Sequence, residues 1–139
     1  MSWQSWAFMS AGFAALTAIF GKIGVAEINS DMATLIRTVV ILGVLAAIVF
    51  ATGQWQALSA IPSRTWIFLA LSGLATGASW LCYYRALKMG DAARVAPVDK
   101  LSIVLVAVFG VLILGERLSA GNWLGVGLCT AGIVLVAMK

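Results

Sequence analysis

The chain has 139 residues, of which 63% are hydrophobic and only 10% are charged. Soluble domains carry about 25% charged residues, so a water-soluble fold of this size cannot hide so much apolar surface, and the composition favours lipid as its solvent. The length suits one compact unit. Histidine is absent, which excludes a histidine-based acid–base pair or metal site.

The net charge of +4 does not point to nucleic acid, because the basic residues stand near the ends of apolar stretches, where they meet anionic headgroups. No basic segment precedes the first apolar stretch. We therefore expect that stretch to be kept as a helix rather than removed as a signal peptide. Cys82 and Cys129 lie in apolar runs without metal-ligand spacing and are interpreted as packing residues. No cofactor is expected.

Five stretches are long and apolar enough to cross a bilayer, which takes about 20 helical residues. They run from about residue 3 to 22, 32 to 51, 65 to 89, 92 to 115 and 120 to 138. Each is continuously apolar rather than alternating, which excludes membrane β-strands. The sequence therefore predicts an all-α integral membrane protein, a bundle of five transmembrane helices that forms a single domain over residues 1–139.

The first predicted helix has Trp3 and Trp6 near its start and Lys22 at its end, which are side chains that anchor a span at the interface. Before the second helix, the run Asn29-Ser30-Asp31 offers N-cap oxygens. Arg37 lies about six residues into that helix, roughly 8–9 Å deep at 1.5 Å per residue. A charge at this depth is costly unless it is paired, hydrated or able to reach the headgroups. Arg37 therefore either bends back to the interface or lines a polar cavity.

The connection between the second and third helices, residues 52 to 64, has apolar residues at spacings of three. This indicates a short amphipathic segment on the interface, ended by Pro62. In the third helix Trp80 and Tyr84 are i,i+4 neighbours. Tyr83 and Tyr84 suit an interfacial aromatic belt. Trp80 stands more than two turns from the helix end and is a candidate to line a cavity and stack on a substrate.

A tight connection is expected between the third and fourth helices, because Gly90 suits a helix C-terminus and Asp91 suits an N-cap. In the fourth helix, Pro97 removes a backbone N–H just before Asp99 and Lys100. Either the helix is broken at this charged site, as in many transport sites, or the chain before Pro97 is extended and the helix begins there.

Asp99 has a short side chain that reaches headgroups poorly. We expect it to face a polar cavity or to pair with Arg37, Arg85 or Arg94. Arg37, Arg85 and Lys100 have long side chains and alternatively bend back to the headgroups. All of these groups approach from one side of the membrane, so they are expected to converge on one vestibule.

Small residues at intervals of four recur in the third and fifth helices, as Gly73 with Gly77 and Gly121 with Gly125. Gly132 extends the second pair two turns further. This spacing lets helix backbones approach closely. The approach is either within one subunit or between two subunits.

An excess of basic residues on one side of the membrane sets the orientation. The first and third connections and the C-terminus share a side with seven basic residues: Lys22, Arg37, Arg85, Lys88, Arg94, Lys100 and Lys139. The other side has two, Arg64 and Arg117. Without Arg37, Arg85 and Lys100, which lie inside spans, the ratio is four to two. The bias predicts an outside N-terminus and a cytoplasmic C-terminus in the inner (plasma) membrane.

Three parts of the chain carry a family resemblance. Residues 83–97 (YYRALKMGDAARVAP) and 112–118 (LILGERL), with Gly125 and the run AGIVL after it, resemble the EamA domain of the drug/metabolite transporter superfamily. The turn at residues 21–22 and Arg37 are similar to the first half of that domain. The resemblance covers nearly the whole chain and depends on the patterns Ala-Leu-Lys-x-Gly and Leu-Gly-Glu-Arg.

Most EamA proteins carry two such five-helix units inserted in opposite senses, whereas this chain has one, like the single-unit bacterial and archaeal members. The resemblance implies export or exchange of small metabolites across the inner membrane. It also implies completion by a homodimer or a paralogue heterodimer, parallel or antiparallel. The charge bias argues against equal insertion both ways.

The leading hypothesis is a secondary transporter in membrane lipid that carries a small-molecule substrate without covalent chemistry. The candidate substrate-binding residues are Arg37, Trp80, Tyr84, Asp99 and Lys100. Arg37 would attract an anionic group, the aromatic rings would stack, and Asp99 would bind a cation or a proton.

Two other functions stay open at this point. One is a non-transporting membrane subunit that assembles or anchors a complex. The other is a cation exporter like the small multidrug-resistance proteins, which have four helices and depend on a glutamate in the first. The first acid of this chain, Glu27, lies past the end of its first helix. An enzyme is not expected, since no nucleophile–base pair, metal cluster or phosphate loop is visible.

Overall fold

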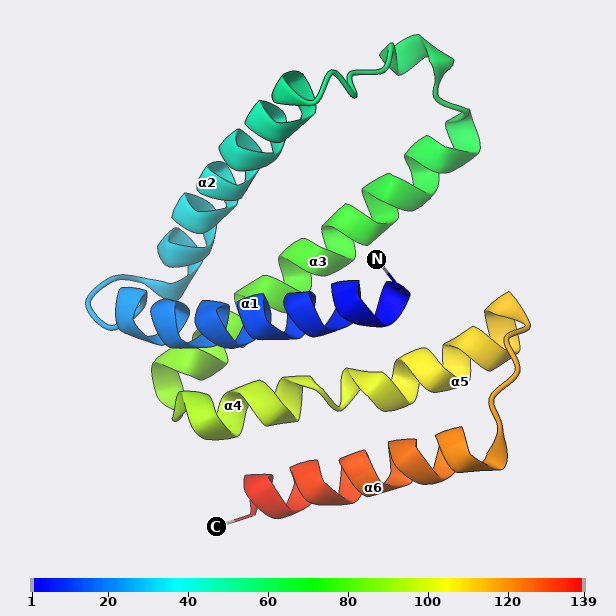
Figure 1. The fold of residues 1–139 in the computed structure, drawn as a ribbon. Helices are drawn as coiled ribbons and strands as arrows, with labels where there is room; N and C mark the ends of the chain where they lie inside the picture. The colour runs from blue at the N-terminus through cyan, green and yellow to red at the C-terminus, as the bar shows by residue number, and fades with distance from the viewer. Residues whose placement is uncertain (1, 139) are drawn as a thin grey trace. The chain divides into compact units, whose positions relative to one another are not determined.

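The computed structural model describes residues 2–138 and is helical throughout that range apart from its connections (Figure 1). The elements are α1 (Trp3–Gly24), α2 (Ser30–Ala51), the short 3₁₀ helix η1 (Leu58–Ala60), α3 (Ser63–Met89), α4 (Ala92–Asp99), α5 (Ser102–Leu114) and α6 (Ala120–Ala137). Five segments are long and apolar enough to cross a membrane, and α4 and α5 together form one of them. The predicted all-α fold with five spans is confirmed. Lys139, which contributes to the predicted charge bias, lies outside the described residues.

Most of the large apolar side chains are exposed in the single chain. Phe8, Leu42 and Phe68, for example, each expose more than half of their surface. Helices that satisfy their own backbone hydrogen bonds and carry such surface are suited to a hydrocarbon environment. Within the chain, residues 19–88 form one compact unit, and residues 1–18 with 89–139 form another.

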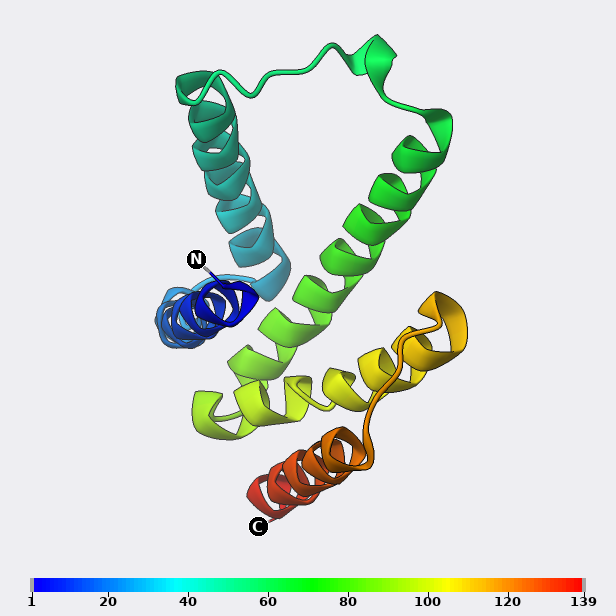
Figure 2. The ribbon, with the colours of Figure 1, turned by 45° about the vertical axis from the view of Figure 1, so that its right-hand side comes forward.

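The unit of residues 19–88 has its core at one end. Here α2 and α3 run in opposite directions and diverge away from the end that carries the α1–α2 connection (Figure 2). At that end Val25 and Leu87 are fully buried and Tyr84 is only 5% exposed. The contacts near the α1–α2 connection therefore decide how α2 and α3 meet.

The last turn of α1 contacts α3 closely because residue 21 is glycine. A Cβ atom at Gly21 would stand 2.8 Å from the hydroxyl oxygen of Tyr84 and 3.4 Å from Leu87 Cδ1. Real Cβ atoms essentially never come within 3.0 Å of another heavy atom. The absence of a side chain at Gly21 is thus what allows the ring of Tyr84 to be buried in this position.

In the second unit, α4 and α5 run along α6 (Figure 1). A guanidinium nitrogen of Arg94 donates to the carbonyl of Ala137 at 3.0 Å, which ties the start of α4 to the end of α6. Gly115 ends α5 with a positive φ of 71°. Ser119 caps α6 by accepting a hydrogen bond from the backbone N–H of Asn122.

Helix boundaries differ from the predicted ones where polar residues start a helix. α2 begins at Ser30, two residues early, because the side-chain oxygen of Asn29 accepts from the backbone N–H of Asp31 at 2.8 Å. Asp91 holds the predicted N-cap position of α4, but its side chain makes no capping hydrogen bond. α3 ends at Met89, directly before Gly90, as predicted.

The helix is interrupted after Pro97, not started by it. α4 runs through Pro97 to Asp99 and α5 begins at Ser102. At the interruption the backbone N–H of Lys100 bonds to the carbonyl of Pro97 at 2.9 Å, and that of Leu101 to Val98 at 3.0 Å. These bonds span three residues instead of four, which tightens the helix locally. Of the two alternatives for this segment, the structure has the broken helix.

The predicted amphipathic segment between α2 and α3 is reduced to the single turn of η1. Before that turn, the ring of Trp55 stacks on Phe50 at the end of α2, with ring centroids 4.9 Å apart. Pro62 follows the turn, and α3 begins at the next residue. Proline just before or at a helix start costs little because the first N–H groups of a helix have no partner within it.

Candidate functional site

The first two turns of α2 carry polar residues at intervals of three: Asp31, Thr34 and Arg37. Residues at this interval are neighbours along one side of a helix. The hydroxyl of the buried Thr34 donates to the carbonyl of Ser30 at 2.9 Å, so its polarity is satisfied within α2. Asp31 and Arg37 are the two groups of this series that reach α3.

Arg37 reaches across to two aromatic rings of α3. Its guanidinium carbon lies 4.2 Å from the ring centroid of Trp80 and 5.2 Å from that of Tyr84. A cation this close to an aromatic face is attracted by the π electrons, most strongly to tryptophan. Arg37 is seven residues from the start of α2, which is about 10 Å along the helix at 1.5 Å per residue. The structure therefore brings together three of the five predicted site residues.

The donors of Arg37 are unused. Within residues 2–138 its guanidinium forms no ion pair and no hydrogen bond. A guanidinium has five N–H donors in one plane, and its attraction to a ring face does not require any of them. Such a fork binds a carboxylate, sulfonate or phosphate through two parallel hydrogen bonds. Arg37 is thus held in place by aromatic rings while its anion-binding edge stays available.

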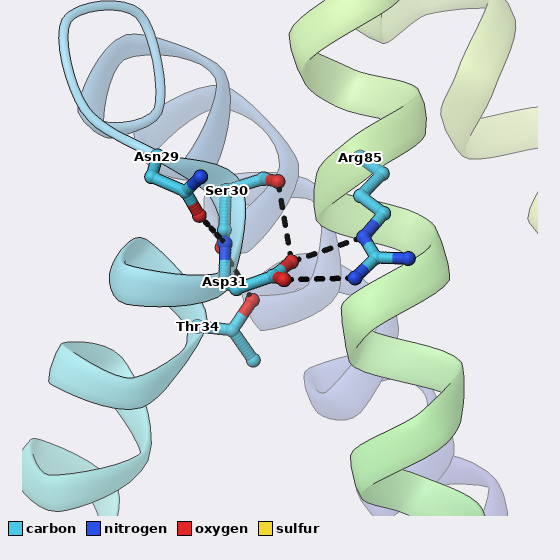
Figure 3. A network of polar contacts seen from close by, with 5 residues as sticks. All are labelled: Asn29, Ser30, Asp31, Thr34 and Arg85. Carbon is cyan, nitrogen blue, oxygen red and sulfur yellow. Dashed lines mark hydrogen bonds and ion pairs between the residues drawn. The ribbon is translucent and has the colours of Figure 1, made fainter.

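Arg85 differs from Arg37, because its guanidinium N–H donors are already bonded to a carboxylate. Its Nε donates to Oδ1 of Asp31 at 3.0 Å and its Nη2 donates to Oδ2 at 2.8 Å (Figure 3). The hydroxyl of Ser30 donates more weakly to the same carboxylate, at 3.4 Å. The side chains of Arg85 and Asp31 are 59% and 47% exposed. This bidentate pair is exposed and lies at the end of the unit that carries the α1–α2 connection.

Two lysines hold the same end of the unit through backbone carbonyls. Lys22 Nζ donates to the carbonyl of Leu87 at 2.7 Å, and Lys88 Nζ donates to the carbonyl of Ile28. Carbonyls in the last turn of a helix lack helical partners and attract cations. The α1–α2 connection and the C-terminus of α3 are therefore joined by contacts that do not involve Asp31 or Arg85.

The remaining two predicted site residues belong to the other unit. Asp99 Oδ2 accepts from its neighbour Lys100 Nζ at 3.0 Å, so its partner is not one of the predicted arginines. Arg94, on the same helix as Asp99, donates to Ala137 instead. The helix interruption at Lys100 allows the neighbouring side chains to meet.

Lys100 also borders an apolar groove of about 380 Å³. The groove is otherwise lined by Pro97, Ile103, Cys129, Gly132, Ile133 and Val136.

The pairing of Asp31 with Arg85 is what sequence reasoning missed. Asn29, Ser30 and Asp31 are all predicted to offer N-cap oxygens, and of the three it is Asn29 whose side chain caps α2. A usable signal did exist, because Asp31 follows the first connection and Arg85 precedes the third. The two residues are thus opposite charges near span ends on the same predicted side of the membrane.

Five membrane-length segments and an unpaired arginine one to two turns inside a span define a multi-pass membrane protein. Comparison with known proteins identifies the class further. The chain belongs to the EamA-like transporter family, which it matches over residues 1–138. The resemblance seen in the sequence is confirmed.

Two relatives carry transporter names. The chain is 74% identical over 137 residues to a Sinorhizobium protein named "Uncharacterized transporter in cobO 3'region", covering 99% of this chain and 97% of the relative. It is 31% identical over 81 residues to an uncharacterized transporter of Pseudomonas aeruginosa, covering 58% of this chain and 27% of that protein. No solved structure matches. This chain is therefore a membrane transporter.

Proposed function

We propose that this protein is a secondary transporter that exports or exchanges small metabolites bearing an anionic group, and that Arg37 binds that group. The observation that carries the proposal is the unpaired guanidinium of Arg37, 4.2 Å from the ring of Trp80. A cation inside a span costs free energy unless it is paired, and an anionic substrate supplies the missing partner. Trp80, which is half-buried, then offers apolar surface to the rest of the substrate, whereas the buried Tyr84 contributes through its contact with Arg37.

Transport of this kind requires binding and release on alternate sides of the membrane, with no covalent step. Asp99 is proposed to bind the coupling cation or proton, and Lys100 to border the path. In the present structure the Asp99 carboxylate is engaged by Lys100 at 3.0 Å. Binding of an ion at Asp99 therefore requires Lys100 to turn away, which the interrupted backbone beside it permits.

The transporter is proposed to act as a dimer of half-size units, formed with itself or with a paralogue. The P. aeruginosa relative supports this arrangement by its size: because 81 residues are 27% of its length, it has roughly 300 residues. Such a chain has room for two units of the present size. Native mass spectrometry in detergent is expected to show two copies, and a monomer that still transports would contradict the dimer.

The proposed location is the inner membrane, with the C-terminus in the cytoplasm. Lys22, Arg85 and Lys88 lie at one end of the unit of residues 19–88, which supports a cytoplasmic position for that end. A reporter that is active only in the cytoplasm should work when fused to the C-terminus. Equal activity of a periplasm-only reporter would overturn the single orientation.

Exchange in proteoliposomes tests the function. Benzenesulfonate and trimethylphenylammonium are planar probes of similar size and opposite charge, and both keep their charge at all ordinary pH values. We expect protein-dependent exchange of the anion and little exchange of the cation. Exchange of the cation alone would favour a multidrug-type cation exporter, and exchange of neither would favour a non-transporting subunit. Unchanged flux in Asp99→Asn would remove Asp99 from the mechanism.

A further inference from the structure

We infer that Arg85 is a second anion-binding position of the same transport path, and that Asp31 occupies it as a resident carboxylate which the incoming substrate displaces. This inference rests on the proposed function and names a residue pair outside the Arg37 site. It explains why one arginine of the α2–α3 end is paired while the other is not.

The Asp31 carboxylate contacts the Arg85 guanidinium as the carboxylate of a bound ligand would. Both oxygens of Asp31 face the two N–H groups of the Arg85 fork, at 3.0 and 2.8 Å (Figure 3). A substrate carboxylate or sulfonate binds guanidinium in the same way. Because the two side chains are 59% and 47% exposed, a free anion can approach. Exposed ion pairs contribute little net stability, so the exchange of one anion for another is nearly balanced.

Other contacts also hold the elements that this ion pair joins. The start of α2 is capped by Asn29 at 2.8 Å, independently of the Asp31 carboxylate. The end of α3 is held by Lys22 through the carbonyl of Leu87 and by Lys88 through that of Ile28. A pair that served only as a structural tie would be redundant with these contacts.

Arg85 and Arg37 follow one another from the end of the unit into the span. Asp31 precedes Arg37 by six residues on α2, which is about 9 Å of helix. On α3, Arg85 directly follows Tyr84, whose ring is 5.2 Å from the Arg37 guanidinium. An anion released from Arg85 therefore finds the free fork of Arg37 a short step further into the span. Asp31 then returns to Arg85 and restores the pair behind it.

Equilibrium dialysis of benzenesulfonate with the full-length protein in nanodiscs tests the inference. Asp31→Asn keeps the size of the side chain but removes the competing charge, and we expect affinity to rise roughly two- to fivefold, as for release from an exposed ion pair. Glu27→Gln removes the same charge from the neighbouring connection and is expected to leave affinity unchanged. Arg85→Gln should lower affinity severalfold, whereas Arg64→Gln, at the other end of α3, should not.

The double variant separates displacement from a general change in charge. If Asp31 acts through Arg85, Asp31→Asn has no effect when Arg85→Gln is already present. An equal gain in both backgrounds, or no gain in Asp31→Asn alone, overturns the inference. Failure of the proposed function looks different, because benzenesulfonate binding would then be absent or independent of Arg37. Asp31→Ser, which also leaves the Asn29 cap intact, replaces Asp31→Asn if that variant does not fold.

Discussion

The guanidinium of Arg37 lies 4.2 Å from the ring centroid of Trp80 and pairs with no carboxylate in the described part of the chain. An aromatic face holds a cation without using its N–H donors. The contact therefore fixes the position of Arg37 while leaving its fork open, whereas the fork of the nearby Arg85 is closed by Asp31. This difference between two arginines is the basis of the transport account.

The contact between Gly21 and Tyr84 predicts a strong effect of a single methyl group. Gly21→Ala places a Cβ atom 2.8 Å from the Tyr84 hydroxyl and 3.2 Å from its ring. Overpacking of this kind costs about 1–3 kcal/mol, so the melting temperature in detergent should fall. Tyr84→Phe should recover part of the loss in the double variant, because it removes the nearest atom.

Gly24→Ala is the control for that experiment, since nothing lies within 4 Å of the corresponding Cβ position. Its melting temperature should equal that of the wild type. Equal melting temperatures for Gly21→Ala and Gly24→Ala would show that Tyr84 does not pack against α1 in this way.

Two glycines at the end of α5 predict opposite outcomes. Gly115 has a φ of +71°, where an L-residue is strained, so Gly115→Ala should destabilise the protein by about 1 kcal/mol. A Cβ at Gly110 would meet only the end of the exposed Glu116 side chain, 2.6 Å away, which can swing aside. Because alanine is the better helix former by up to about 1 kcal/mol, Gly110→Ala should be neutral or stabilising. Thermal unfolding of both variants checks the prediction, and the reverse order of stability would contradict it.

Pro97 is expected to cause the interruption between α4 and α5. Pro97→Ala restores the missing N–H, and proline inside a helix costs about 3 kcal/mol relative to alanine. Hydrogen exchange at residues 97–104 should slow, and flux should fall if the interruption moves during transport. Pro62→Ala is the matched control, because this proline precedes α3 rather than interrupting a helix. Unchanged exchange in Pro97→Ala would assign the interruption to the Asp99–Lys100 pair instead.

The spans were predictable from sequence because apolar length alone decides whether a helix crosses a membrane. The start of α2 was placed two residues late because Ser30 and Asp31 are polar, and their place in the first turn depends on the Asn29 cap. The depth of each residue in its span and the chemistry of its side chain were enough to identify Arg37, Trp80 and Tyr84 individually as candidate site residues.

The contact of Arg37 with Trp80 and Tyr84 was not predictable from local pattern. Neither was the pairing of Asp31 with Arg85. Asp31 and Arg85 are 54 residues apart in the chain, and their pairing depends on how α1 packs against α3 at Gly21. No local propensity or periodicity encodes a contact between residues so far apart. Asp99 is a different case, because the partners predicted from its side of the membrane are arginines, whereas the observed partner is the adjacent Lys100.

Benzenesulfonate exchange by Arg37 variants in proteoliposomes tests the central claim most directly. Arg37→Gln should reduce exchange at least tenfold, because hydrogen bonds to a charged group contribute about 1.5–3 kcal/mol. Arg37→Lys should keep part of the activity, since it retains the charge but not the fork. Arg64→Gln, whose guanidinium lies 5.8 Å from the Phe68 ring at the other end of α3, should match the wild type. Wild-type exchange by a folded Arg37→Gln protein would contradict the account.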